Sequence, residues 1–176
     1  MIHHISIPAR DPEHVAKVLA ELIGGHTGGY AGPFVGPIPG AWVAYAEDAH
    51  GTGIEVYPER TTLVPGEAGS MGAVALREAP AAVAFHALIS VKAGRAEIER
   101  IGAREGWRTL HFWRGPNPQT RLFELYEFWV ENRVMLELAT EDMVDAYRKL
   151  AQGPAQRELL ARLGGGRPRS RLSAWP

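Results

Sequence analysis

Two histidines and two glutamates recur at one spacing in this chain of 176 residues. His4 precedes Glu55 by 51 residues, and His86 precedes Glu137 by 51 residues as well. Each glutamate lies between two apolar residues of a short apolar segment, so strand geometry turns its carboxylate to the opposite face from its neighbours. A single His or Glu on a strand is usually structural, but two unrelated pairs would rarely share this interval. We interpret the four residues as one site.

The residue types of this site favour a metal. Two imidazoles and two carboxylates form a mixed nitrogen and oxygen ligand set for a divalent first-row ion such as Ni, Co, Zn, Fe or Mn. The chain has no cysteine, which excludes thiolate ligands and thiolate nucleophiles. A bound metal polarises substrate oxygens and favours an enediolate, while a carboxylate that leaves the metal acts as the base. Glu137 and Glu55 are therefore the predicted catalytic residues.

Glu137 is the favoured base of the two. Its strand is followed at once by Thr140 and by a helical stripe that we expect to pack against the site, whereas Glu55 leads into a long open connection.

The elements that would position these residues occur twice. Each half of the chain has the pattern strand, helix, strand, strand, strand, which predicts an α+β fold. We divide the chain into a first module at 1–59, a connection at 60–83, a second module at 84–140, and C-terminal helices with a mobile tail at 141–176. Within the first module, Asp11 and Pro12 predict a helix start, and the Gly- and Pro-rich segment 24–40 predicts an irregular loop with at most one short strand. A short second C-terminal helix is expected at 156–163.

Composition narrows the function classes. The chain is 45% hydrophobic and 22% charged with a net charge of −1, which is typical of a globular domain and gives no general attraction to nucleic acid or anionic membranes. The N-terminus has neither the basic start nor the apolar run of a signal peptide, and no segment approaches the roughly 20 apolar residues of a membrane span. We expect a cytoplasmic protein whose partner is a small-molecule substrate.

Four segments together resemble the vicinal oxygen chelate superfamily, which includes glyoxalase I, extradiol dioxygenases and bleomycin-binding proteins. The resemblance covers about residues 1–140 and is carried by the segments His4–Asp11, Gly53–Tyr57, Phe85–Val91 and Val134–Leu138. It implies two βαβββ modules whose sheets form a cup with a metal on the concave face. In glyoxalase-like members the positions of His4, Glu55, His86 and Glu137 are all ligands, and a ligand glutamate is also the base. We further expect a homodimer.

The resemblance leaves the reaction open. Glyoxalase-like lyase or isomerase chemistry through an enediolate on a small oxygenated molecule is favoured. A ring-cleaving dioxygenase would need only the triad His4, His86 and Glu137. A non-catalytic antibiotic-binding protein is the remaining alternative, although such relatives typically lack the ligands that this chain retains.

Further side chains are candidates for the substrate pocket. Tyr57 shares a strand face with Glu55 and should lie near the metal. His111 lies in an aromatic strand that could line the cup, and we assign His111, Trp113 and Tyr126 to substrate binding with Tyr57. Glu124 and Glu127 lie on opposite faces of the strand predicted at 121–130, and the sequence does not decide which of them enters the pocket.

Overall fold

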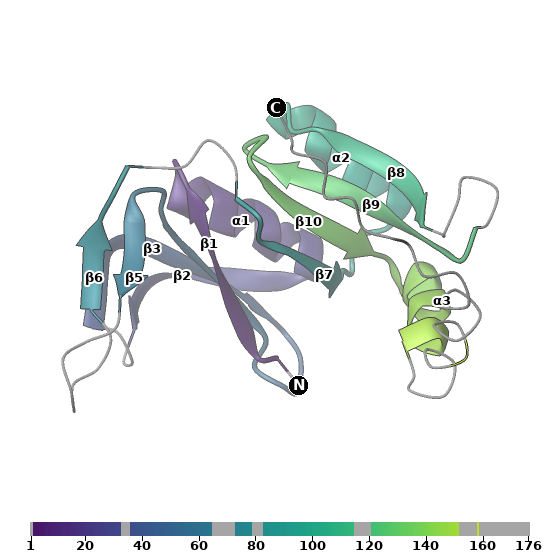
Figure 1. The fold of residues 1–176 in the computed structure, drawn as a ribbon, viewed down its shortest axis with the longest axis horizontal. Helices are drawn as coiled ribbons and strands as arrows, with labels where there is room; N and C mark the ends of the chain where they lie inside the picture. Colours follow the sequence, from purple (N-terminus) through teal and green to yellow (C-terminus); the bar gives the residue numbers. More distant parts are fainter. Residues whose placement is uncertain are drawn as a thin grey trace, which may run out of the picture.

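The computed structural model describes residues 2–32, 36–64, 73–78, 83–114, 121–151 and 158. Two four-stranded mixed sheets and three helices form an α+β fold of two βαβββ modules (Figure 1). The first module consists of β1 (His4–Ala9), α1 (Pro12–Ile23), β2 (Gly25–Gly32), β3 (Gly36–Ala46) and β4 (Gly53–Pro58). The second consists of β7 (His86–Ser90), α2 (Arg95–Glu105), β8 (Thr109–Arg114), β9 (Phe123–Val130) and β10 (Val134–Ala139). The fold class predicted from the repeated pattern is confirmed.

The two sheets have the same topology. Their strand orders are β1-β4-β3-β2 and β7-β10-β9-β8, with the first strand of each module parallel to the last and the other pairs antiparallel. In the first sheet His4 pairs with Gly53, two residues before Glu55. In the second sheet His86 pairs with Met135, again two residues before Glu137. The equal spacing in the sequence therefore reflects an equal register in the two modules.

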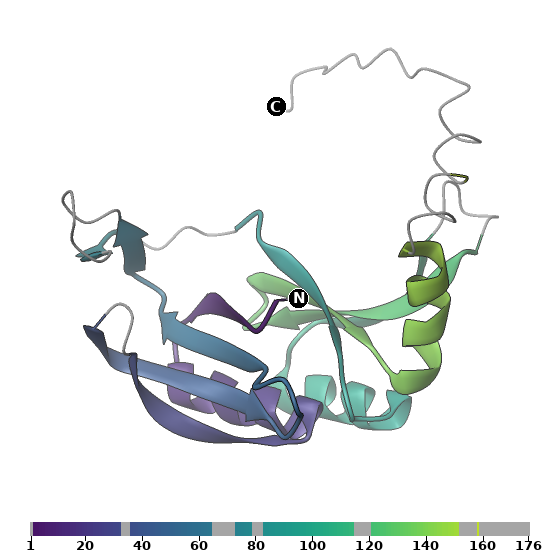
Figure 2. The same ribbon diagram turned by 90° about the horizontal axis from the view of Figure 1, so that it is seen from below.

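One hydrophobic core joins the modules. Alternate residues of the inner strands, such as Ile54 and Val56 in β4 or Leu136 and Leu138 in β10, are buried in a cluster that also contains the apolar faces of α1 and α2. Figure 2 shows both helices on the same side of the sheets. The glutamates alternate with these core residues, so Glu55 and Glu137 lie on the faces turned away from the helices.

Local signals define both ends of α1. The Asp11 carboxylate accepts a hydrogen bond from the His14 backbone N–H at 3.1 Å, which confirms the predicted N-cap. The helix ends at Gly24, whose φ of 67° is the left-handed conformation that glycine adopts most easily. α2 ends in the same way at Gly106, which also has a φ of 67°.

The prediction of an irregular loop at 24–40 was wrong, because β2 and the start of β3 occupy most of this segment. Gly25 has a structural reason: a Cβ atom at this position would lie 1.8 Å from the Tyr45 carbonyl oxygen, so this close strand pairing requires glycine. Residues 33–35 lie outside the described part of the chain.

The connection between the modules contains a short antiparallel ribbon. It is formed by β5 (Thr61–Val64) and β6 (Ala73–Leu76), which the sequence analysis did not predict. After the second module, α3 (Glu141–Ala151) follows Thr140 directly, as expected. The helix predicted at 156–163 and the tail after it fall outside the described residues, apart from residue 158. Within the described part, no helix is long and apolar enough to span a membrane.

Candidate functional site

Glu55 is a carboxylate on the face of the first sheet that is turned away from the helices, which we call the open face. It is nevertheless buried, with only 6% of its surface exposed. Its Oε2 accepts hydrogen bonds from the Ser6 hydroxyl at 2.8 Å and from the Tyr57 hydroxyl at 2.6 Å. Burial, together with the bond to Glu55, raises the pKa of Tyr57 to about 12, so the phenol remains a donor at neutral pH. Tyr57 thus lies beside Glu55, on the face predicted from strand alternation.

Glu137 is the corresponding buried carboxylate of the second sheet, with 8% of its surface exposed. Its Oε1 lies 2.5 Å from Nη2 of Arg114, and the same nitrogen lies 3.1 Å from Oε1 of Glu127. Glu127 pairs directly with Glu137 across β9 and β10, so the two carboxylates share one face and one guanidinium. Of the two alternatives left open by the sequence, Glu127 and not Glu124 lies on the face of Glu137.

The four predicted metal ligands hold equivalent positions but do not form one cluster. Both glutamates are buried, whereas His4 and His86 are exposed. Among the residues that the structure describes, no group of three or more His, Asp or Glu side chains is placed to hold a metal ion. As placed, the four residues therefore do not fit a single ion, and the site is present as two separate His–Glu pairs.

His111, Trp113 and Tyr126 lie on the other face of the second sheet. His111 pairs with Tyr126 in register, and Tyr126 is offset by one residue from Glu127. The Tyr126 hydroxyl donates to Glu99 of α2 at 2.7 Å, which fixes this face as the helix side. The assignment of these three side chains to a pocket with Glu137 is corrected accordingly. Strand alternation separates the two faces, but it does not tell which one packs against the helices.

A polar network occupies the outer part of that helix side. Nε2 of His111 lies 2.6 Å from Oε2 of Glu124, and Arg95 donates two hydrogen bonds to the Glu124 carboxylate at 3.0 and 2.6 Å. Arg95 also contacts Asp142 of α3 at 2.7 Å. The Arg95 guanidinium, followed by His111, lowers the pKa of Glu124 below its ordinary value. This network connects the second sheet to α3.

Arg114 and Glu127 are the site residues that sequence reasoning missed or left undecided. An arginine at the end of an aromatic strand has no sequence feature that marks it as a site residue. Its position one strand away from Glu127 would have been visible only with the register of β8 on β9.

The open face of the second sheet also contains a buried donor. The indole Nε1 of Trp129, two residues after Glu127 in β9, is buried and has no hydrogen-bond partner among the described residues. An unsatisfied buried N–H costs about 1–3 kcal/mol. Such a group is commonly satisfied by a water molecule or a ligand.

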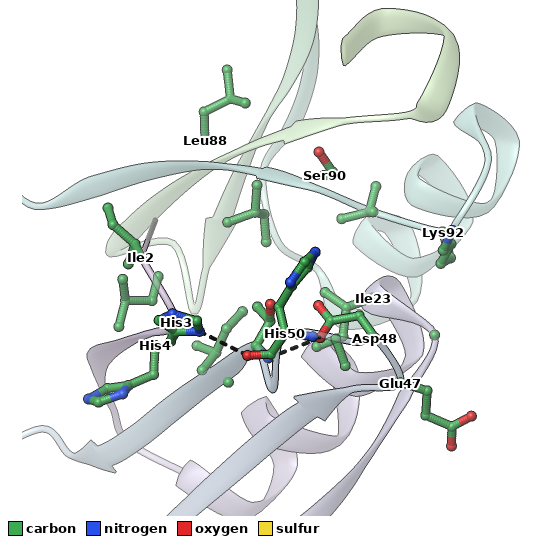
Figure 3. A pocket seen from close by; sticks show the side chains of 18 of the residues that line it. Ile2, His3, His4, Ile23, Glu47, Asp48, His50, Leu88, Ser90 and Lys92 are labelled. Carbon is green, nitrogen blue, oxygen red and sulfur yellow. Dashed lines mark hydrogen bonds between the residues drawn. The ribbon is translucent and has the colours of Figure 1, made fainter. Parts of the chain in front are cut away.

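Figure 3 shows a second region, a pocket that neither carboxylate lines and whose volume is about 620 Å³. It is bounded by the start of β1, the turn between β3 and β4, the end of β7, and α3. Aliphatic and polar side chains both line it, among them Ile23, Leu88, His50, Ser90 and Lys92. Of the four predicted ligands, His4 lines this pocket, whereas Glu55, His86 and Glu137 do not.

Comparison with known proteins adds little to this geometry. No family model and no curated protein matches the chain. Among solved structures, the chain is similar to oxidase ChaP-H2, with a TM-score of 0.40 and 15% sequence identity over 80% of this chain and 93% of that chain. A similarity at this level carries no argument about function, so the functional inference rests on the site alone.

Proposed function

We propose that the protein is a divalent-metal-dependent enzyme that acts on a small oxygenated molecule, with lyase or isomerase chemistry of the glyoxalase type. The observation that supports this proposal is the equivalence of two half-sites. Glu55 and Glu137 occupy the same position in their strands, lie on the same face and are both buried. In each module a histidine of the neighbouring strand pairs with the residue two positions before the glutamate. A repeat that preserves core residues alone would not also repeat a buried carboxylate on the open face.

The chain's own residues support proton transfer at this face. A carboxylate is the acceptor needed to remove a proton next to a carbonyl group, and burial restricts its contact with water. Tyr57 keeps its proton at neutral pH and orients one oxygen of Glu55. The metal, when bound, would supply polarisation of the substrate oxygens. The residues that would hold such an ion are His4, Glu55, His86 and Glu137.

The test is the metal content of the purified chain and of matched variants. We expect one first-row metal ion per chain in the wild type. We expect this ion to be lost in His86→Ala, because one of its four ligands is removed. The control is His26→Ala, since His26 is an exposed histidine of β2 outside both pairs. Elemental analysis after removal of loosely bound ions measures the metal content of the wild type and of the two variants.

Turnover measurements then distinguish a glutamate that only binds the metal from the glutamate that acts as the base. Once a substrate is found, Glu137→Gln should lower turnover by orders of magnitude, with Glu55→Gln as the comparison. Full metal occupancy in His86→Ala would refute the ligand assignment. Tight binding of a small molecule by a wild-type chain that holds no metal would support the non-catalytic binding protein.

A further inference from the structure

The pocket shown in Figure 3 is lined by both modules and is separate from the two buried carboxylates. Apart from His4, it contains none of the residues on which the proposed function rests. Its volume of about 620 Å³ falls within the roughly 300–1,000 Å³ that is typical of small-molecule sites. The pocket is therefore large enough for a ligand of its own.

The inner wall of this pocket is aliphatic. It is formed by four side chains that are each less than a tenth exposed, namely Ile23, Ile54, Val91 and Val144. None of the described Phe, Tyr or Trp side chains lines the pocket. Burying an alkyl chain against such a wall is favourable, whereas an aromatic ring would find no aromatic side chain to stack on. The wall therefore favours an aliphatic ligand.

Along β7 and the residues after it, the lining changes from apolar to polar. Leu88 and Ser90 lie on one face of β7, Lys92 follows two residues later, and all three line the pocket. The Lys92 backbone N–H donates to the Leu22 carbonyl group at 3.0 Å, and a Cβ atom at Gly24 would lie 3.0 Å from Cγ of Lys92. The base of the Lys92 side chain is thus fixed beside the end of α1.

The polar side chains on this side of the pocket offer hydrogen-bond donors. The Ser90 hydroxyl, the His50 ring and the Lys92 ammonium group form no hydrogen bond or ion pair with another residue that the structure describes. Figure 3 shows the His50 ring extending from the turn between β3 and β4 toward β7. A ligand group that accepts hydrogen bonds, above all an anionic one, suits these donors.

Two of the acids that line the pocket are engaged by other groups. The Glu47 carboxylate lies 3.8 Å from the His26 ring, and Figure 3 shows it turned outward. The Asp48 carboxylate accepts hydrogen bonds from two backbone N–H groups of its own turn, at 2.8 and 3.2 Å. Glu141 is the remaining acid, and Arg148 of the same helix adds a second cation to the lining.

We propose that this pocket binds a small aliphatic carboxylate, with its carboxylate group at Lys92 and its alkyl chain against the aliphatic wall. Hydrogen bonds from an ammonium group to a carboxylate are stronger than those between neutral groups. The inference goes beyond the proposed function, because the site is separate from Glu55 and Glu137. Since both modules line the pocket, the bound ligand stabilises the folded chain against unfolding.

Calorimetric titration of the full-length chain with octanoate tests this proposal. We expect saturable binding of octanoate, and binding of octylammonium that is weaker by about tenfold or more, because the same alkyl chain then has the opposite charge. Lys92→Met keeps an aliphatic side chain and should weaken octanoate binding about tenfold, the effect of losing one charged hydrogen bond. Lys92→Arg retains a cation and should bind octanoate nearly as tightly as the wild type.

Two further variants locate the binding. Ser90→Trp introduces a large ring from an exposed position of β7 and should abolish octanoate binding. Lys149→Met is the control for net charge, because Lys149 is an exposed lysine of α3 that does not line the pocket. Thermal unfolding of every variant, with and without octanoate, separates a loss of binding from a loss of folding.

The contrary outcomes are distinct. The absence of saturable octanoate binding, or equal octanoate affinities for the wild type, Lys92→Met and Ser90→Trp, would overturn the proposal. Tighter binding of octylammonium than of octanoate would also overturn it, and would indicate a cation held by Glu141. A Lys92→Met variant with lower stability but unchanged octanoate affinity would show that this lysine serves only the end of α1. None of these outcomes depends on the metal content of the chain, so the proposed function is tested separately.

Discussion

Glu55 in the first module and Glu137 in the second stand at equivalent positions of equivalent strands, yet the described residues around them differ in kind. Ser6 and Tyr57 are neutral donors to Glu55, whereas Glu137 forms an ion pair with Arg114 that it shares with Glu127. The backbone register is the same in both cases. A repeated fold thus fixes where a buried carboxylate stands, but not how it is stabilised.

The helix side of the modules shows the opposite tendency. Both helices end at a glycine with a φ of 67°, and both sheets place alternate aliphatic residues in one shared core. Packing against a helix leaves few acceptable side chains, because interiors are close-packed. The face turned away from the helices does not belong to this shared core, and there the residues around Glu55 and Glu137 differ between the modules.

The largest expected effect comes from breaking the ion pair of the second module. Arg114→Met leaves the buried Glu137 and the half-buried Glu127 carboxylates side by side and should lower the free energy of unfolding by about 2 kcal/mol, less than for a fully buried pair because Arg114 is partly exposed. Urea denaturation at neutral pH measures this loss. Arg121→Met should change the stability by no more than about 0.5 kcal/mol.

A second substitution tests the cause of that loss. Glu127→Gln added to Arg114→Met removes the repulsion between the carboxylates, so part of the lost stability should return. If the double variant is no more stable than Arg114→Met, then repulsion between Glu127 and Glu137 is not what Arg114 relieves.

A smaller effect is expected from the neutral donors of the first module. Tyr57→Phe removes one hydrogen bond to Glu55 and should cost about 1 kcal/mol. The pKa of Tyr57 is raised to about 12 in the folded chain, against about 10 for a free tyrosine. Its contribution is therefore complete below pH 10 and is lost as the pH rises toward 12. The stability difference between wild type and Tyr57→Phe should be constant up to pH 10 and then shrink.

The control for this alkaline profile is Tyr147→Phe. Tyr147 is 36% exposed and contacts the Phe123 ring, and phenylalanine preserves that contact. The same pH dependence in both variants would contradict the role of the Tyr57–Glu55 bond.

The smallest effect is expected at the connection between the second sheet and α3. Arg95 lowers the pKa of Glu124 and, after Thr140, that of Asp142, so its contribution is present above the ordinary pKa of these acids and is lost as the pH falls. Arg95→Met should cost less than about 1 kcal/mol at neutral pH, because the Arg95 side chain is partly exposed, at 38%. Below pH 4 the wild type and the variant should converge. Arg108→Met, at an exposed position next to β8, should show no such convergence.

The sequence by itself determined the features that depend on local periodicity. Strand alternation placed Tyr57 on the face of Glu55, the Asp11 and Pro12 signals gave the start of α1, and the equal spacing of the two His–Glu pairs gave the repeat. These signals lie within a few residues, or within a recurring interval, so they can be read before any contact between distant segments is known.

Only the tertiary structure decided which faces meet. Whether Glu124 or Glu127 stands beside Glu137, and whether His111 faces the helices, depends on the register of β8, β9 and β10, and a shift by one residue would reverse both answers. The pairing of the glycine-rich β2 with β3 is equally non-local, since Gly25 is required by the Tyr45 carbonyl group of another strand. Arg114 becomes a partner of Glu137 for the same reason: three strands of one sheet bring together residues that the sequence keeps far apart.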